Sequence, residues 1–355
     1  MPFRRAKNYI RIAYRLGIFP PFRQLLGGRK AYAYQGYLGD NNYGDELVYQ
    51  ATKEIFQPDI LVPIQRIMPL SHLLVSRLIP GRYAGIVIGG GTLIGPSFYE
   101  SSLFCRLAEQ GKQIFLHGTG VYKTSFWNPD WLRFFRNPVS GGVRGSRSAA
   151  NFMATVPGTV NPIGDASFAL YDPALARPTG TISNTLLINC GTHKPYPNFL
   201  ACRAAMDSVI TDHLARGGQV QFLPCHAIDI EIARELQQRF PAIQLLPVPR
   251  NLPEALAHFR RAQFALGERL HFTASAILAH CPFFSINYAD KHDDLLESIG
   301  LEAFGADPAA VTRKLIDQAR TSGESFSWDQ ASAALLRFRQ LQRQRALAFR
   351  QATAS

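Results

Sequence analysis

A repeated pattern of short apolar runs, each ending at a glycine turn before a helical segment, constrains the fold of this chain most. Such runs lie at residues 31–35, 85–88 and 114–117, before Gly36, Gly89 and Gly118 respectively. Apolar runs of this length are typical of buried strands, and their alternation with helices predicts a parallel sheet covered by helices. In such sheets ligands bind at the carboxyl ends of the strands.

The same alternation starts again after Pro178. The expected strands are residues 185–190, 219–224, 263–267 and 283–288, and the expected helices are residues 201–215, 228–240 and 272–279. A chain of 355 residues exceeds the usual size of one domain. We therefore expect an α/β protein with two Rossmann-like, doubly wound domains facing a central cleft. The expected parts are a basic N-terminal segment at 1–30, domains at 31–175 and 183–327, and a C-terminal helix at 328–355.

The positive charge is concentrated near the N-terminus. The chain has 38 Lys and Arg against 26 Asp and Glu, but eight of the basic residues precede Asp40, the first acidic one. This distribution argues against a nucleic-acid-binding surface spread over the whole protein. Residues 1–19 read as a basic amphipathic helix, which predicts either peripheral contact with an anionic membrane or packing on the body with a solvated basic face.

Cysteine usage and hydropathy indicate the compartment. The five cysteines are far apart and include no C-x-x-C pair, so neither a disulfide framework nor a zinc site is indicated. No apolar run reaches the length of a membrane span, and the first residues lack the apolar region of a secretory signal. We expect a cytoplasmic protein.

Two glycine-rich turns are candidates for binding an acceptor. Closely spaced glycines before a helix expose backbone N–H groups, and Asn42 and Asp45 beside them are suited to contact sugar hydroxyls. Gly90, Gly91 and Thr92 lie in a second turn that lets a ligand or the other domain approach the backbone. Each turn alone is equally typical of a plain strand-to-helix connection.

Cationic side chains follow two later strands. Arg269 and His271 come directly after the strand ending at Gly267, and Lys291 follows the next one. Because neighbouring parallel strands end at the same edge of a sheet, we expect these residues to form a site for an anionic substrate. Arg144 is a further candidate for a carboxylate or phosphate, although a surface position at a helix start is the alternative.

Taken together, these motifs resemble the polysaccharide pyruvyltransferase family over about residues 33–305. The matching segments, in the family's order, are 39–46, 89–92, 143–148, 164–168, 269–271 and 288–291. Members of this family have a two-domain fold like that of GT-B glycosyltransferases. The chain departs from the family pattern at Gly145, where Asp is frequent, and at Ala166, where Pro is frequent.

The resemblance implies transfer of pyruvate from phosphoenolpyruvate to a sugar, with formation of a ketal and release of phosphate. It implies that phosphoenolpyruvate binds to a set of residues in which His271 is the general acid and Arg269 and Lys291 also act in catalysis: Arg144, Arg269, Leu270, His271 and Lys291. Asp45 or Asp165 is expected as the acceptor-side base. No metal or cofactor is expected. The implied acceptor is a hexose of a bacterial exopolysaccharide, a capsule or a lipid-linked repeat unit.

Two other functions compete with this reading. The first is a nucleotide-sugar glycosyltransferase on the same fold; Glu46 and Glu54 have the E-x7-E spacing of some such enzymes, but they lie in the N-terminal half, where that motif is not expected. The second is a non-catalytic member of the family, which Gly145 and Ala166 leave open. The combination of Arg269, His271 and Lys291 favours the pyruvyltransferase.

Overall fold

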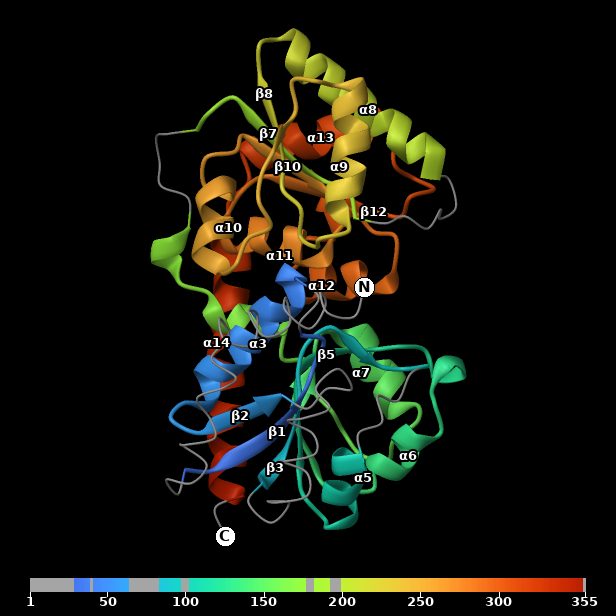
Figure 1. Ribbon diagram of the computed structural model, residues 1–355, viewed down its shortest axis with the longest axis vertical. Helices are drawn as coiled ribbons and strands as arrows, with labels where there is room; N and C mark the ends of the chain where they lie inside the picture. The colour runs from blue at the N-terminus through green and yellow to red at the C-terminus, as the bar shows by residue number, and fades with distance from the viewer. Residues whose placement is uncertain are drawn as a thin grey trace, which may run out of the picture. The chain divides into compact units, whose positions relative to one another are not determined.

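The computed structural model describes residues 29–38, 41–63, 83–96, 102–176, 182–191 and 199–353. The chain forms two compact units, shown in Figure 1. Unit 1 holds the chain up to Asp40, Asp45–Leu170 and Leu335 onward, and unit 2 holds Asn41–Gly44 and Tyr171–Ala334. The basic helix expected at 1–19, with Gly39 and Asp40, lies outside the described residues.

Unit 1 is built on a parallel sheet in the order β2-β1-β3-β5-β4, with β6 also paired to β5. Its strands and helices occur in the following order: β1 (Ala31–Gln35), α3 (Tyr43–Phe56), β2 (Ile60–Pro63), β3 (Tyr83–Ile88), β4 (Thr92–Ile94), α5 (Ser102–Glu109), β5 (Ile114–Val121), α6 (Asp130–Phe134), β6 (Val139–Val143) and α7 (Ser146–Met153). Short 3-10 turns lie at Thr124–Phe126 and Ala166–Leu170. The predicted parallel α/β arrangement is confirmed.

One strand of unit 1 runs further than its sequence suggests. Gly118 and Gly120 do not form a turn after the strand; they lie inside β5, where the register with β6 shifts between His117 and Thr119. Gly118 has a φ of +60°, and a Cβ at this position would lie 2.5 Å from the amide nitrogen of Ala166. These glycines therefore let a neighbouring loop pack directly on the strand.

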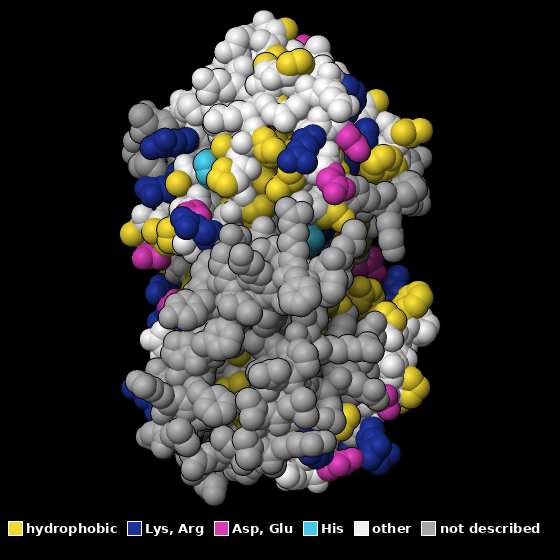
Figure 2. Space-filling model, viewed as in Figure 1, with side chains coloured by type: hydrophobic (Ala, Val, Ile, Leu, Met, Phe, Trp, Pro, Cys, Tyr) yellow, Lys and Arg dark blue, Asp and Glu magenta, His cyan; other side chains and the backbone are white. Residues whose placement is uncertain are grey.

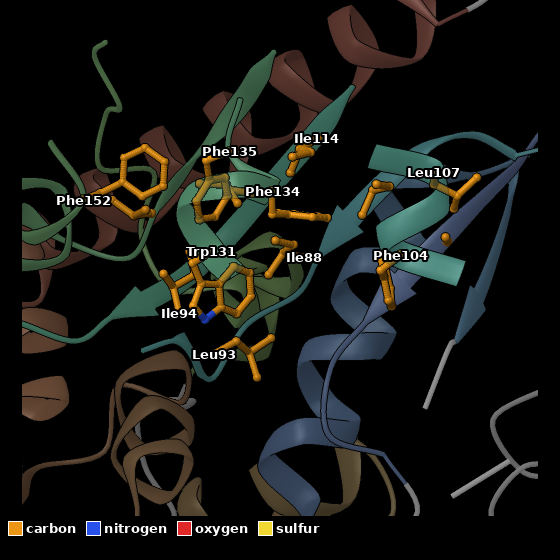
Figure 3. Close-up of a cluster of buried hydrophobic side chains, with 14 of the residues drawn as sticks. Ile88, Leu93, Ile94, Phe104, Leu107, Ile114, Trp131, Phe134, Phe135 and Phe152 are labelled. Atoms are coloured by element: carbon orange, nitrogen blue, oxygen red, sulfur yellow. The ribbon is translucent and has the colours of Figure 1, made fainter. Parts of the chain in front are cut away.

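Aromatic packing holds one face of the unit 1 sheet. Trp131 and Phe135 of the α6 region stack with ring centroids 5.4 Å apart, and Phe135 meets Phe152 of α7 edge to face. Figure 3 shows these rings beside Ile88 and Ile94 from the ends of β3 and β4. Burial of such large rings is the main favourable contribution to the stability of this layer.

The last helix, α14 (Asp329–Ala352), begins among the residues of unit 2 and continues into unit 1. Two of its leucines, Leu336 and Leu347, are exposed. Residues at spacings of three and four face the core of unit 1 instead: Leu335, Phe338, Gln342, Ala346 and Phe349. Phe349 contacts the rings of Tyr32, Phe56 and Phe115, so this helix is part of the core of unit 1.

Unit 2 has a parallel six-stranded sheet in the order β12-β11-β10-β7-β8-β9. Its strands and helices occur in the following order: β7 (Thr185–Asn189), α8 (Phe199–Ala215), β8 (Gln219–Phe222), α9 (Asp229–Arg239), β9 (Gln244–Leu245), α10 (Leu252–Phe259), β10 (Phe264–Gly267), α11 (Leu270–Leu278), β11 (Phe283–Ile286), α12 (Asp290–Ser298), β12 (Gly305–Ala306) and α13 (Arg313–Glu324). Short 3-10 turns lie at Pro173–Leu175 and Glu302–Phe304. When the strands are numbered from the start of the unit, their order in the sheet is 3-2-1-4-5-6, which is the order of Rossmann folds. The strand order reverses between β7 and β10.

Candidate active site

The cationic residues of unit 2 follow neighbouring strands, as the sequence predicts. Gly267 at the end of β10 pairs with Ser285 of β11. Arg269 is the N-cap of α11 and His271 lies in its first turn, while Lys291 lies in the first turn of α12. The site is thus built on two helix N-termini at the carboxyl edge of the sheet, and helix N-termini favour anions.

The site also lies where the strand order reverses. Asn189 ends β7, the neighbour of β10 on the side opposite to β11. Its Oδ1 atom accepts a hydrogen bond from the Arg269 amide at 3.1 Å, and its Nδ2 atom donates to the carbonyl of Leu223 at 2.9 Å. Ligands of open α/β sheets bind at such a reversal point. Sequence spacing and sheet topology therefore indicate the same edge of the unit 2 sheet as the ligand-binding site.

Arg269 is fixed by a buried carboxylate. Its Nη2 and Nε atoms donate to Asp229 Oδ1 at 2.5 and 3.1 Å, and the carboxylate is fully buried while the arginine side chain keeps 24% of its surface exposed. Asp229 Oδ2 in turn accepts hydrogen bonds from the amides of Cys225 and His226. Burial alone would lower the pKa of Arg269, but the hydrogen bonds and charge of Asp229 outweigh it and raise the pKa. The guanidinium is charged and pre-oriented.

A second ion pair supports the same loop. Glu268 is fully buried and pairs with Arg203 of α8 at 3.0 Å. It also accepts a hydrogen bond from the amide of Gly191 at 3.0 Å. A Cβ at residue 191 would overlap the side chain of Arg269, so glycine is required where the chain passes this guanidinium. The loop between β10 and α11 is therefore fastened on both sides of Arg269.

His271 lies beneath a short segment from the N-terminal half of the chain, Asn41–Gly44, which we call the strap. The amide of Tyr43 donates to the carbonyl of Cys225 at 2.8 Å, and Asn42 forms a β-bridge with His226. Tyr43 Oη contacts Ser275 Oγ at 2.8 Å, and that hydroxyl donates to the carbonyl of His271 at 2.7 Å. His271 as a residue is 8% exposed, and Gly44 packs on its imidazole. The strap thus contributes directly to the histidine's surroundings.

Lys291 is oriented by an aromatic neighbour. Its Nζ atom donates to Tyr288 Oη at 2.8 Å and lies 4.8 Å from the centre of the same ring. Tyr288 therefore orients the Lys291 ammonium through a hydrogen bond and a cation–π contact.

Two residues of this site were not among the sequence predictions. Asp229 and His226 follow β8, the strand next to β7, and Asp229 is the partner of Arg269. The signal that could have found them is a histidine and an aspartate just past an apolar strand in the same half of the chain. His226 Nδ1 accepts a hydrogen bond from the amide of Ile228 at 3.1 Å, so in the neutral ring the proton resides on Nε2.

Arg144 belongs to unit 1, whereas Arg269, His271 and Lys291 belong to unit 2. It is fully buried after β6, and its Nε atom donates to Asp165 Oδ2 at 2.9 Å. Asp165 Oδ1 accepts hydrogen bonds from Ser167 N and Oγ at 3.0 and 2.7 Å. Asp165 therefore supplies the orienting carboxylate that Gly145 cannot. The Nη1 and Nη2 atoms of Arg144 have no hydrogen-bond partner among the described residues.

The remaining acceptor candidates are divided between the units. Asp45 lies in unit 1, and its Oδ1 atom would be 3.4 Å from a Cβ at Gly91, whose φ is +87°. A Cβ at Gly90 would be 2.6 Å from Val48 of α3, so this glycine is needed for close packing. Thr92 Oγ1 is buried near Gly120, beside Arg144 Nη1. Asn42 belongs to unit 2, where its Oδ1 accepts a hydrogen bond from the amide of Gly44.

The described residues carry mixed surface charge on one face, with no group of side chains suited to a metal ion and no membrane-spanning helix. On the face in Figure 2, Lys and Arg side chains are interspersed with Asp and Glu. Within the described ranges, no three His, Cys, Asp or Glu side chains gather so that they would hold a metal ion. No helix in this part of the chain is both long and apolar enough to cross a bilayer.

The fold and the edge site define a GT-B-like α/β protein, and solved structures support this class. The UDP-N-acetylglucosamine 2-epimerase of Rickettsia bellii matches with a TM-score of 0.56 and 11% identity, over 91% of this chain and 96% of its own. A putative epimerase of the same kind from Listeria monocytogenes matches with a TM-score of 0.52 and 12% identity, over 86% and 91%. At these identities the likeness shows the fold alone.

The family model for polysaccharide pyruvyl transferase matches residues 42–290, which is more than half of the chain. The chain therefore belongs to the polysaccharide pyruvyl transferase family, and the resemblance seen in the sequence is confirmed. No curated protein matches the chain significantly.

Proposed function

We propose that the protein transfers pyruvate from phosphoenolpyruvate to a sugar of a polysaccharide or its precursor, forming a ketal and releasing phosphate. Membership of the family supports a transferase of this kind. The observation that carries the proposal is the edge of the unit 2 sheet, where Arg269, His271 and Lys291 lie at the starts of two adjacent helices. This combination offers two fixed cations and a proton donor, which an anionic enol phosphate requires.

Positively charged side chains bind the donor substrate, phosphoenolpyruvate. Arg269, oriented by Asp229, and Lys291, oriented by Tyr288, bind the phosphate and carboxylate groups of phosphoenolpyruvate. The backbone amide of Leu270 at the start of α11 adds a donor aimed along the helix axis. In unit 1, the two terminal nitrogens of Arg144 are the candidates for binding an anionic group of a substrate.

His271 acts as the general acid. Its proton goes to the CH2 carbon of phosphoenolpyruvate, and C2 becomes an oxocarbenium-like electrophile. One sugar hydroxyl adds to C2 and gives up its proton, the C2–O bond to phosphate then breaks, and a second hydroxyl closes the ketal. Of the two hydroxyl protons taken up by the acceptor-side base, one in the end replaces the proton that His271 gave and the other leaves with the phosphate, so the step is balanced. A positioned acid of this kind contributes about 10²–10⁴-fold to the rate.

The acceptor side is assigned to the strap and the start of α3. Asp45 is the candidate base for the sugar hydroxyl, and Asn42 is the candidate hydrogen-bonding contact. Asp165 is fully buried and already accepts three hydrogen bonds, which suits it to orienting Arg144 rather than to accepting a proton. A lipid-linked acceptor would explain a basic N-terminal segment at 1–19. We propose that the reaction takes place in the cytoplasm, at the inner face of the cytoplasmic membrane.

Thermal stability with separate ligands tests the proposal without knowledge of the acceptor. A ligand at 100 times its dissociation constant stabilises by roughly 2.7 kcal/mol, on the order of several degrees for a chain of this size. We expect phosphoenolpyruvate to raise Tm and the His271→Ala and Lys291→Ala variants to lose the shift. A shift with nucleotide sugars alone would support a glycosyltransferase instead.

A further inference from the structure

Gln342 is a fully buried amide in the apolar stripe of α14. Its Nε2 atom donates to two backbone carbonyls, of Ile163 at 2.8 Å and of Asp165 at 2.9 Å. Its Oε1 atom lies 3.1 Å from Nε2 of the buried His117. Both donor positions and the acceptor of this amide are therefore used. A leucine at this position would fill the apolar stripe without burying polar groups that need partners. An amide whose donors and acceptor all have partners therefore indicates that its hydrogen bonds serve a specific function.

The two backbone carbonyls fix the direction in which the Gln342 amide faces. Gln342 uses its NH2 group on the two carbonyls, so its Oε1 must accept from His117 Nε2–H. Thr52 Oγ1 lies 2.8 Å from His117 Nδ1 and 2.8 Å from the carbonyl oxygen of Val48, so its one hydroxyl proton faces two acceptors. Burial lowers the pKa of His117 to about 4, so the ring is neutral at physiological pH. The two backbone carbonyls therefore leave the amide one orientation, and the neutral His117 ring with its proton on Nε2 matches it.

The two carbonyls that Gln342 binds flank Gly164, which has a φ of +80°. The loop they belong to is fastened to the end of β6, because Ile163 N donates to the carbonyl of Val143 at 2.8 Å. Arg144 is the next residue, and its Nε atom is held by the Asp165 carboxylate of this same loop. The position of Gln342 thus sets the position of Asp165, and Asp165 sets the guanidinium.

We propose that Gln342 is a positioning residue that fixes the orientation of Arg144 through the backbone of Asp165. A small movement of this loop would rotate the Asp165 carboxylate and redirect Nη1 and Nη2, the two nitrogens of Arg144 that have no partner among the described residues. The part of the inference that concerns substrate binding by Arg144 rests on the proposed function. The part that concerns the orientation of Arg144 does not rest on the proposed function, because every contact in the series of hydrogen bonds lies within unit 1.

The test uses the full chain with Gln342→Met, which keeps the length of the side chain and removes its hydrogen bonds. The first measurement is the NMR signal of the Arg144 Nε–H group, identified by its loss in Arg144→Lys. We expect Gln342→Met to shift this signal and to increase its exchange with water at least tenfold. Ala346→Gly is the matched control: it weakens the same buried stripe four residues on and should leave the Arg144 signal in place. An unchanged signal in folded Gln342→Met would overturn the inference.

The second measurement separates positioning from general stability. With phosphoenolpyruvate and acceptor, Gln342→Met should raise the KM of the substrate that Arg144 binds at least fivefold, with a smaller effect on kcat. In the Arg144→Lys background it should raise KM no further. Additive effects on KM would overturn the inference. If the wild-type protein neither binds nor uses phosphoenolpyruvate, the proposed function fails, and the NMR comparison still decides the role of Gln342.

Discussion

Gly44 packs directly on the imidazole of His271, so that a Cβ on residue 44 would overlap Nδ1 and crowd Cγ at 2.8 Å. The two residues come from opposite halves of the sequence but belong to the same compact unit. The glycine of the strap therefore determines how much room the proposed general acid has, and it links the first motif of the chain to the chemistry of the second half.

Gly44→Ala should impair catalysis more than folding. The added methyl displaces either the imidazole or the strap, and loss of a positioned acid lowers kcat by about 10²-fold or more. Gly300→Ala is the matched control, because residue 300 has a φ of +72° and open space around it, so the substitution strains the backbone without reaching His271. Equal kcat values for the two variants would contradict the account of the strap.

Asp229→Asn should weaken donor binding. The amide keeps the shape of the carboxylate but removes the charge that orients Arg269, and a charge-assisted hydrogen bond contributes roughly 1.5–3 kcal/mol, or about 10–100-fold in kcat/KM. The expected change is mainly a higher KM for phosphoenolpyruvate. Asp212→Asn, which removes a partner of Arg313 on the surface, should leave KM unchanged. Steady-state kinetics of the two variants check this prediction.

The buried pair of Arg144 and Asp165 should show strong coupling in stability. Asp165→Leu alone leaves a buried guanidinium without its carboxylate, which costs about 3–5 kcal/mol. Removing both charges in Arg144→Met with Asp165→Leu should recover most of that loss, because neither charge then remains unpaired. Urea unfolding of the single and double variants measures the coupling. Simple addition of the single effects would show that the pair is not energetically linked.

His117 should make the protein less stable in mild acid. Its pKa is about 4 in the folded protein, against 6.5 for an unperturbed histidine, because burial disfavours the charged ring. The unfolded chain thus binds the extra proton first, and the free energy of unfolding falls as the pH drops from about 6.5 to about 4. The full loss is about 3 kcal/mol. His117→Asn should flatten this part of the profile, as measured by urea unfolding at several pH values; an unchanged slope would contradict it.

The fold was largely predictable because strands of a parallel sheet are continuous apolar runs. Residues 31–35 and 185–189 became strands where expected. β6 was missed because its sequence, VSGGV, has two glycines that disfavour a strand; their lack of side chains is what lets Phe115 and Ile163 pack against them. The prediction of a glycine turn after residue 117 was wrong for the same reason, because glycine occurs both in turns and where two backbones pack closely.

The site was predictable only in part. The placement of Arg269, His271 and Lys291 at one sheet edge follows from strand order, which the sequence pattern contains. Asp229 was missed because a single aspartate at a helix start is common. Contacts between residues 44 and 271, or 342 and 165, depend on how distant segments pack, and no local pattern records them.

The most direct test of the central claim follows both products of the reaction together. Protein, phosphoenolpyruvate and a lipid-linked glycan acceptor would be incubated, and released phosphate compared with pyruvate ketal on the glycan. The account predicts equal amounts of the two, and loss of both in His271→Asn. Transfer of a sugar from a nucleotide sugar to the same glycan, with phosphoenolpyruvate left intact, would contradict it.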